Sequence, residues 1–284
     1  MRPEGQRWQV SYMKLLAKPR RILITGASRG IGRATALALA ERGHSLVLAA
    51  RGREALESVA GQIRRTGGNA QAIVLDVTST ESVDRAISEA LASGRLDVLV
   101  NNAGSCLQRE FSRCTDAELA DEMSLNYFGA QRMIRAVLPT FVQQRSGLIV
   151  NVSSLVGSSA APTTANYSAS KAALEAFSHA LRGEVARSGV HVTVFVAPHT
   201  QTELGQRTEF RGVTSLPVAY VARELVHAID RAPRRYAASP VYRLLLRLAA
   251  WFPRMMERQM LACVRHLLTE PVSSEHGRHR STRE

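Results

Sequence analysis

The sequence predicts an α/β protein, with a doubly wound, Rossmann-like parallel sheet in a single domain and a helical C-terminal extension. Two observations support this prediction. Short runs rich in Val, Ile and Leu alternate with amphipathic helical patterns, and a glycine-rich turn follows the first of these runs. Strands of a parallel sheet are apolar along their length because helices cover both faces. With 284 residues, 45% of them hydrophobic, the chain is long enough to bury such a core.

Six apolar runs are predicted to form the strands: RILIT (21–25), SLVLAA (45–50), AIVLDV (72–77), LDVLVNN (96–102), GLIVNVSS (147–154) and VHVTVFVA (190–197). Helical patterns such as GRATALALAERG and ESVDRAISEALASG lie between them, as the crossovers of a parallel sheet require. We divide the chain into a basic N-terminal segment (1–20), a Rossmann-like domain (21–230), an amphipathic helical extension (231–270) and a disordered tail (271–284).

The formal charge of +13 lies mostly in the two ends of the chain. Residues 1–21 carry a net charge of +5 and residues 231–284 a net charge of +7, which leaves +1 for residues 22–230. A nearly neutral central domain offers no broad basic face for nucleic acid. The basic ends indicate appendages with a partner of their own.

The three cysteines, Cys106, Cys114 and Cys263, form neither an even set nor a metal-ligand spacing. We therefore expect no disulfide framework, no metal site and a reducing compartment. The first 21 residues contain no apolar run long enough for a signal peptide, and no later segment reaches the ~20 apolar residues of a membrane span. These observations predict a cytoplasmic protein.

The first predicted strand runs into the glycine-rich stretch TGASRGIG (25–32), which opens a helical pattern. Gly26, Gly30 and Gly32 permit a tight turn and a close backbone approach, and N–H groups at the start of a helix bind pyrophosphate. The spacing differs from the G-x-G-x-x-G dinucleotide fingerprint. An ordinary turn between strand and helix is the alternative interpretation.

The stretch NYSASKAAL (166–174) places Tyr167 and Lys171 four residues apart, with small residues between them. On a helix this spacing makes the two side chains neighbours on one face, and the small residues let another surface approach closely. Taken alone, these residues are equally compatible with a chance surface pair.

Four motifs in the order TGASRGIG (25–32), NNAG (101–104), NVSS (151–154) and YSASK (167–171) resemble the short-chain dehydrogenase/reductase family. The resemblance covers roughly residues 20–230. It implies an oxidoreductase that uses a nicotinamide dinucleotide, has a catalytic tyrosine–lysine pair and forms a homodimer or homotetramer.

Carbonyl reduction explains why a tyrosine and a lysine are needed. A proton donor near the carbonyl oxygen accelerates such a reaction, typically about 10²- to 10⁴-fold. Tyr167 is the candidate donor. A free phenol has a pKa of about 10, and a cation one helical turn away, here Lys171, favours its ionised form.

The resemblance assigns further roles around this pair. It implies that Lys171 also holds the nicotinamide ribose and that Ser154, thirteen residues before Tyr167, hydrogen-bonds the substrate oxygen. The neighbouring Ser153 is not expected to do so. Asn126, in MSLNYFG, matches the asparagine that supports the lysine through water in this family. An ordinary asparagine in a helix interior is the alternative for Asn126.

The end of the second strand indicates the cofactor. Enzymes that prefer NAD place an acidic residue there, whereas a 2′-phosphate needs cations. The strand ends in Ala-Ala-Arg, no carboxylate occurs before Glu54, and Arg29 and Arg51 are placed to clamp a phosphate. We therefore expect NADP(H), with solvated surface arginines as the alternative. The resemblance and these arginines together imply a cofactor site made of Gly26, Ser28, Arg29, Gly30, Ile31, Gly32, Arg51, Asp76, Val77, Asn102, Ala103, Gly104, Tyr167, Lys171 and Thr202.

The segment APHTQTEL (197–204) departs from the family pattern. Ala197 and Pro198 occupy the positions of a usual Pro-Gly pair, which removes a backbone freedom beside the cofactor. Thr202 still aligns with the threonine that contacts the nicotinamide amide. His199 either faces the substrate or is merely a polar loop residue.

Two classes of function remain open. The first is an NADPH-dependent enzyme that reduces an apolar, possibly lipid-like ketone or aldehyde, or oxidises the corresponding alcohol. Its pocket wall is expected to include Cys106, Leu107, Val156 and Pro162, while the variable substrate loop (203–220) carries no recognisable code. The alternative is a non-catalytic NADP(H) sensor or scaffold, which would not need the proton-transfer residues.

The C-terminal extension contains two basic amphipathic patterns on either side of Pro253. The predicted apolar stripes are Val241, Leu244, Leu245 and Leu248 in residues 239–251, and Met256, Met260, Val264 and Leu267 in residues 254–268. The arginines of both patterns lie off the stripes. Such helices either cover a pocket or subunit interface, or lie peripherally on an anionic membrane, which the basic N-terminal segment with Trp8 and Tyr12 would also favour.

Overall fold

The computed structural model describes residues 19–268 and contains one sheet of seven parallel strands. The strands are β1 (Arg21–Thr25), β2 (Ser45–Ala50), β3 (Asn69–Val74), β4 (Val98–Asn101), β5 (Gly147–Ser154), β6 (Val190–Ala197) and β7 (Arg235–Ala237). Their spatial order is β3-β2-β1-β4-β5-β6-β7. The order changes direction between β1 and β4, and ligands of such sheets bind beyond the carboxyl ends of the strands at this switch.

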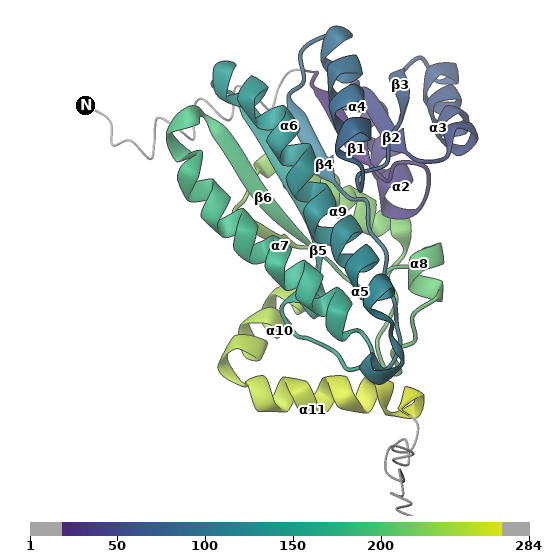
Figure 1. Cartoon of the computed structure of the whole chain (residues 1–284), viewed down its shortest axis with the longest axis vertical. Helices are drawn as coiled ribbons and strands as arrows, with labels where there is room; N and C mark the ends of the chain where they lie inside the picture. The colour runs from purple at the N-terminus through teal and green to yellow at the C-terminus, as the bar shows by residue number, and fades with distance from the viewer. Residues whose placement is uncertain (1–18, 269–284) are drawn as a thin grey trace, which may run out of the picture.

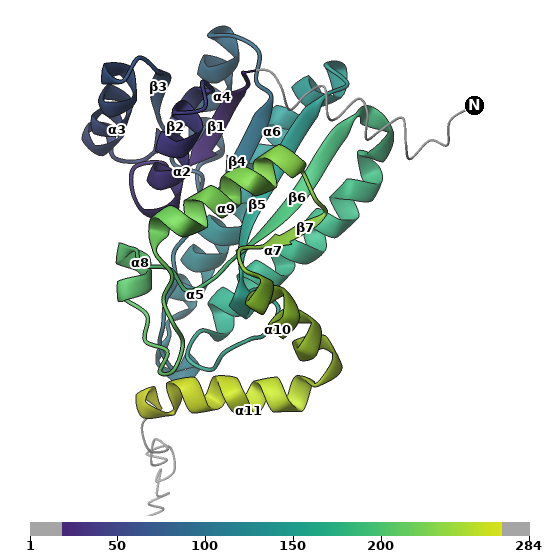
Figure 2. The same cartoon turned by 180° about the vertical axis from the view of Figure 1, so that it is seen from behind.

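Helices cover both faces of the sheet, which confirms the predicted doubly wound fold. One face carries α2 (Gly30–Ala40), α3 (Arg53–Arg65) and α9 (Val218–Arg231), and the other carries α4 (Thr80–Ala92), α6 (Gly129–Gln143) and α7 (Ala165–Glu184). Figure 1 shows α6 and α7 in front of the strands, and Figure 2 shows α9 on the opposite face. Along β1, Ile22 and Ile24 enter one core and Leu23 enters the other, as the alternation of side chains in a strand requires.

Three strands differ from the sequence prediction. β4 spans residues 98–101 instead of 96–102. β3 spans residues 69–74 instead of 72–77, because Leu75 makes the last hydrogen bond of the ladder and the chain then turns. Asp76 stabilises this turn by accepting hydrogen bonds from the backbone N–H and the hydroxyl of Thr78. β7 lies beyond the predicted domain boundary at residue 230. Three residues are too few for an apolar periodicity to be detected in the sequence.

The C-terminal extension forms α10 (Pro240–Trp251) and α11 (Pro253–Val264), close to the expected ranges. Ser239 caps α10 through its side chain, and Pro253 occupies the start of α11, where no N–H is needed. The stripe expected on α10 is not the face that packs against the sheet. Tyr242 and Leu246 pack against the outer strands of the sheet, whereas Val241 and Leu244 are 63% and 58% exposed.

The predicted apolar stripe of α11 packs against the rest of the protein, since Met256 and Val264 are buried. No helix within residues 19–268 is both long and apolar enough to cross a membrane. Most of the basic N-terminal segment, with Trp8 and Tyr12, and the whole of the predicted tail (271–284) lie outside the described residues.

Candidate active site

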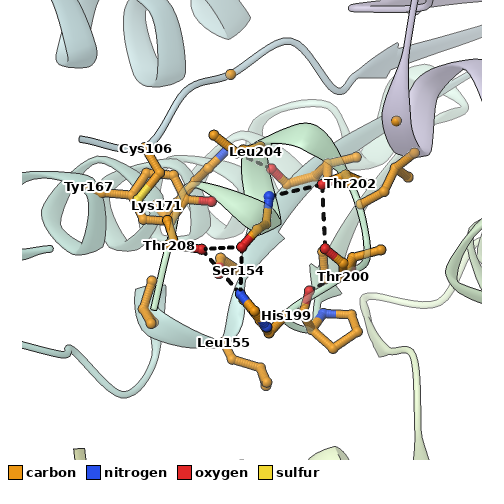
Figure 3. Close-up of a pocket in the computed structure, with 18 of the residues that line it drawn as sticks. Cys106, Ser154, Leu155, Tyr167, Lys171, His199, Thr200, Thr202, Leu204 and Thr208 are labelled. Atoms are coloured by element: carbon orange, nitrogen blue, oxygen red, sulfur yellow. Dashed lines mark hydrogen bonds between the residues drawn. The ribbon is translucent and has the colours of Figure 1, made fainter. Parts of the chain in front are cut away.

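A large cavity lies at the carboxyl ends of the central strands and has a volume of about 1200 Å³. Its walls come from the glycine-rich turn, the ends of β2, β4, β5 and β6, the segment after β6 with α8 (Glu203–Gln206), and the helices α10 and α11. Figure 3 shows Ser154, Tyr167 and Lys171 in this wall, and Cys106, His199 and Thr202 also line the cavity.

The cavity brings together nearly all the residues that the sequence predicted for it. The residues that line it are Gly26, Ser28, Arg29, Gly30, Ile31, Arg51, Asp76, Val77, Asn102, Ala103, Gly104, Ser154, Tyr167, Lys171 and Thr202. Gly32 and Asn126 lie behind the wall and contact residues that line it.

The glycine-rich turn has the geometry of a cofactor cradle. Gly26 and Gly30 have φ angles of +66° and +56°, which side-chain-bearing residues rarely adopt. A Cβ at Gly32 would lie 2.4 Å from the carbonyl oxygen of Gly26. Asn102 bonds the same turn, because its side-chain amide donates to the carbonyl oxygens of Thr25 and Gly26 at 3.0 and 3.2 Å. The NNAG motif (101–104) therefore stabilises the glycine-rich turn by hydrogen bonds.

The N-terminus of α2 points its free N–H groups at this cradle. The N-cap residue Arg29 makes no side-chain cap, and the first turn of α2 contains no acidic residue. Uncapped N–H groups and the helix dipole attract an anion. The residues present therefore fit the pyrophosphate of a dinucleotide.

The end of β2 is basic. Arg29 and Arg51 are exposed and line the cavity, and Arg51 is close enough to Asp76 to lower the pKa of that carboxyl, although the hydrogen bonds from Thr78 contribute more. The sequence analysis did not foresee that Arg29 forms an ion pair with Glu203 at the start of α8. This partner is far away in the sequence, and no local pattern indicates it.

The tyrosine and lysine lie in the first two turns of α7, as predicted from their spacing. The Lys171 ammonium donates a hydrogen bond to the carbonyl oxygen of Val152 at 3.0 Å and lies 5.7 Å from the centre of the Tyr167 ring. Ser154 ends β5 at the cavity. The neighbouring Ser153 is engaged elsewhere, because its hydroxyl donates to Glu175 at 2.7 Å.

Burial dominates the ionisation of this pair. It raises the pKa of Tyr167, while a hydrogen bond with Ser154 lowers it. It also lowers the pKa of Lys171 to about 8, against the opposing charges of Glu122 and Glu175. We expected the lysine to lower the tyrosine pKa, but in this site desolvation of the phenolate is the larger effect. Tyr167 is thus a protonated phenol near neutral pH, as a proton donor must be.

Asn126 lies in a π-helical turn, Ser124–Phe128, between α5 (Asp116–Met123) and α6. Its amide oxygen accepts from the N–H of Ser105 at 2.9 Å, and its amide nitrogen donates to the hydroxyl of Ser170 at 3.2 Å. Asn126 therefore joins the segment after β4 to the residue before Lys171. π-Helical turns occur frequently at functional sites.

The substrate side of the cavity is mostly apolar. Of the four expected wall residues, Cys106 and Val156 line the cavity, whereas Leu107 and Pro162 do not. Side chains of α10 and α11 complete the wall, among them Leu245, Leu246, Met255, Met256 and Met260. The first alternative for these helices, that they cover a pocket, is therefore what the structure shows.

His199 also lines the cavity and stabilises the loop that follows β6. Its Nε2 atom is 3.1 Å from both the carbonyl oxygen of Gly205 and the hydroxyl of Thr208 (Figure 3). A carbonyl oxygen only accepts, so Nε2 carries the hydrogen. The imidazole therefore links the C-terminal end of α8 to the segment that follows β6.

Comparison with known proteins agrees with this geometry. The short chain dehydrogenase family model matches residues 20–210. A fatty acyl-CoA reductase of Acinetobacter baylyi is 37% identical over 221 residues, which cover 76% of this chain and 74% of the relative. A 3-ketodihydrosphingosine reductase of Bacteroides thetaiotaomicron is 39% identical over 169 residues, or 59% of each protein.

Solved structures share the fold. A short-chain dehydrogenase from Sphingobium yanoikuyae in complex with NADPH has a TM-score of 0.73 and 27% identity, and the match covers 91% of this chain and 100% of that one. A short-chain dehydrogenase/reductase from Burkholderia phymatum in complex with NAD has a TM-score of 0.76 and 22% identity, covering 90% and 98%, and supports the fold alone.

Proposed function

We propose that this chain, which belongs to the short-chain dehydrogenase family of oxidoreductases, is an NADPH-dependent reductase of a long-chain, lipid-like ketone or aldehyde, or the dehydrogenase of the corresponding alcohol. The observation that carries the proposal is the position of Ser154, Tyr167 and Lys171. They lie where a glycine-rich phosphate cradle and an apolar chamber meet in one cavity.

The proposed roles follow from the chemistry of each side chain. When bound, NADPH supplies the hydride. Ser154 hydrogen-bonds the substrate oxygen and orients the carbonyl. Tyr167 gives its phenolic proton to that oxygen as negative charge develops on it. Lys171 binds the cofactor ribose and favours the phenolate that remains, and Asn126 holds the lysine's helix against the segment after β4.

The preference for NADPH rests on charge. Arg29 and Arg51 border the cavity at the end of β2, and the residues that follow this strand include no carboxylate before Glu54 to accept a ribose 2′-hydroxyl. Guanidinium groups bind phosphate through charge-assisted hydrogen bonds. Arg29 would exchange its ion pair with Glu203 for the 2′-phosphate.

The lipid-like substrate is inferred from the chamber beyond the catalytic residues. Its walls include methionines of α11, which are flexible enough to accommodate a variable alkyl chain. Two relatives carry names that refer to acyl or sphingoid substrates. We infer the same chemical class for this chain, as a homodimer or homotetramer in keeping with its family.

We also propose that α10 and α11 touch an anionic membrane peripherally. Exposed apolar side chains occur along α10, at its junction with α11 and in the first turn of α11, and we call them together the α10–α11 apolar face: Val241, Leu244, Trp251, Phe252 and Met255. Val241 and Met255 also line the cavity, so the cavity opens at this face. Four exposed arginines of these helices provide complementary charge for anionic headgroups: Arg243, Arg247, Arg254 and Arg258. Figure 2 shows both helices together at one end of the molecule.

Replacing Tyr167 by Phe tests the enzymatic proposal. The variant keeps the ring but loses the proton, so kcat for NADPH oxidation with a long-chain ketone or aldehyde should fall by about 10²-fold or more. NADPH affinity, measured by fluorescence, should stay within a factor of about two because the phenol contributes little to binding the phosphates. Tyr220→Phe, on α9 and outside the cavity lining, is the matched control.

The proposal fails if Tyr167→Phe turns over at nearly the wild-type rate while a kinetic isotope effect with deuterated NADPH shows that chemistry limits the rate. A wild-type protein that binds NADPH but reduces none of a panel of carbonyls graded by chain length would favour the sensor or scaffold alternative.

A further inference from the structure

A buried carboxylate beside the active site has no role in the function proposed above. Glu122 lies on α5 and is only 3% exposed, although its neighbour Asp121 is exposed to solvent. A buried carboxylate is unfavourable unless it is hydrogen-bonded and its charge is compensated. The groups around Glu122 supply both the hydrogen bonds and the opposite charge.

Two segments of the active site donate to Glu122. The backbone N–H of Leu107 donates to Oε1 at 2.7 Å, and the side-chain amide of Asn166 donates to Oε2 at 2.8 Å. Burial raises the pKa of Glu122, and the N–H groups of these two partners oppose that shift because they favour the ionised form. Leu107 follows Cys106, which lines the cavity, and Asn166 immediately precedes Tyr167.

Glu122 also stands one helical turn before Asn126, so the two side chains project from the same face. Asn126 joins Ser105 to Ser170, the residue before Lys171. Glu122 makes the equivalent connection one turn earlier, from Leu107 to the residue before Tyr167. The pair forms two parallel links between the segment after β4 and the first two turns of α7.

The charge of Glu122 raises the pKa values of three titratable groups. Lys171, on α7, is the cation whose charge opposes the rise that burial causes in the pKa of Glu122. Tyr167 on α7 and Cys106 in the segment after β4 are the other two. Burial raises the pKa of the Cys106 thiol to about 12, so this group is neutral at physiological pH. On the other side of Lys171, Glu175 is committed to Ser153 and Arg235.

We propose that Glu122 is a positioning residue of the reaction, which fixes the start of α7 against the segment 105–107 and compensates the buried charge of Lys171 with its own. Only the expected effect of Glu122 on the reaction rests on the proposed function. The position and charge of Glu122 are testable without substrate.

The sign of the electrostatic effect follows from the geometry. A carboxylate nearby favours the ammonium form of Lys171 and disfavours the phenolate form of Tyr167, so it raises both pKa values. Removing the charge lowers both. In either direction of the reaction, the limb of the pH–rate profile that reports this pair should move to lower pH.

The chain offers a direct measurement of Lys171, because it contains only three lysines, Lys14, Lys18 and Lys171. NMR titration of protein labelled with ¹³C at the lysine Cε should give three signals, of which Lys171→Arg identifies one. We expect Lys171 in the wild type to titrate near pH 8. In Glu122→Gln it should titrate about half a pH unit or more lower, whereas Asp121→Asn, which removes an exposed charge from the same helix, should leave it unchanged.

Kinetics separates the charge from the hydrogen bonds. Asn166→Ala breaks the link to α7 but keeps the carboxylate, so kcat should fall several-fold at all pH values with the limb unmoved. Glu122→Gln should move the limb of the pH–rate profile that reports Tyr167 and Lys171 to lower pH. At pH values above this limb, kcat/KM should fall by up to about a further tenfold.

An unchanged Lys171 titration in a folded Glu122→Gln protein would overturn the inference, whatever the enzymatic activity. A uniform loss of activity with an unmoved limb would also overturn it, because packing alone would then explain Glu122. Failure of the function proposed above would appear differently, as a wild-type protein without carbonyl turnover but with the predicted shift of Lys171.

Discussion

Arg51 at the end of β2 is the residue on which the proposed choice of NADPH most depends. It lines the cavity, and its side chain is exposed to solvent, where a phosphate can reach it. Arg29 on the other side of the same site is already paired with Glu203. The sequence predicted both arginines of this phosphate site, but it did not predict that Glu203 would compete with the phosphate for Arg29.

Arg51→Ala should therefore raise KM for NADPH by about 10-fold or more, since a charge-assisted hydrogen bond contributes about 1.5–3 kcal/mol. KM for NADH should hardly change because its ribose carries no phosphate. Steady-state kinetics with both cofactors measures this selectivity. An equal rise in both KM values would contradict the phosphate assignment.

Glu203→Gln provides the complementary variant at this site. It releases Arg29, and because both partners of the ion pair are more than half exposed, the effect should be small. KM for NADPH should fall by no more than about fivefold. A rise in KM would show that Glu203 orients Arg29 instead of competing for it.

At the scale of elements, α10 has apolar side chains on two faces. Tyr242 and Leu246 pack on the sheet, and Leu244 and Trp251 remain exposed. The sequence pattern predicted the helix and its apolar residues correctly. It could not tell which apolar face the sheet would cover, because both faces satisfy a helical period.

The proposed membrane contact makes a prediction about the α10–α11 apolar face. The double variant Leu244→Ser/Trp251→Ser should bind vesicles of 70% phosphatidylcholine and 30% phosphatidylglycerol at least about tenfold more weakly than the wild type, because burial of apolar area supplies much of the binding. Co-sedimentation at low and high salt measures the affinity and its electrostatic part.

Val142→Ser is a suitable control for the membrane experiment. Val142 is 40% exposed near the end of α6, which leads into the start of β5 and so lies at the opposite edge of the sheet from the cavity. If intact wild-type protein fails to bind these vesicles at low salt, the membrane proposal is wrong. If instead the variant alone loses self-association, the face is a contact between copies of the chain.

For the whole molecule, His44 links stability to pH. Its Nδ1 atom accepts a hydrogen bond from the backbone N–H of Arg20 at 3.1 Å, at the start of β1, so the folded protein needs the neutral imidazole. Burial, followed by the charge of Arg20, lowers the pKa of His44. Burial also lowers the pKa of His191.

A lowered pKa in the folded state means that the unfolded chain takes up the proton first as pH falls. The contribution of these histidines is fully present above their unfolded pKa of about 6.5 and is lost as pH falls through the folded value. We expect the Tm to decrease between pH 7 and pH 5. His44→Asn, which keeps an acceptor for the Arg20 N–H, should flatten this dependence, and an unchanged slope would exclude His44 as a cause.

The sequence by itself determined the parts of this protein that depend on neighbours in the chain. Apolar runs predicted six of the seven strands, the glycine-rich turn predicted the start of α2, and the four-residue spacing of Tyr167 and Lys171 placed both side chains on one face of α7. These features are local, because the period of a strand or helix and the conformational freedom of glycine are properties of a short segment.

Only the tertiary structure decided which distant groups meet. It buried Glu122 between Leu107 and Asn166, paired Arg29 with Glu203, and placed α10 and α11 over the cavity. Nothing in the residues around Glu122 separates it from Asp121, its exposed neighbour in the same helix. Burial and charge compensation are set by the elements packed against a side chain, and these come from parts of the chain that a local pattern does not include.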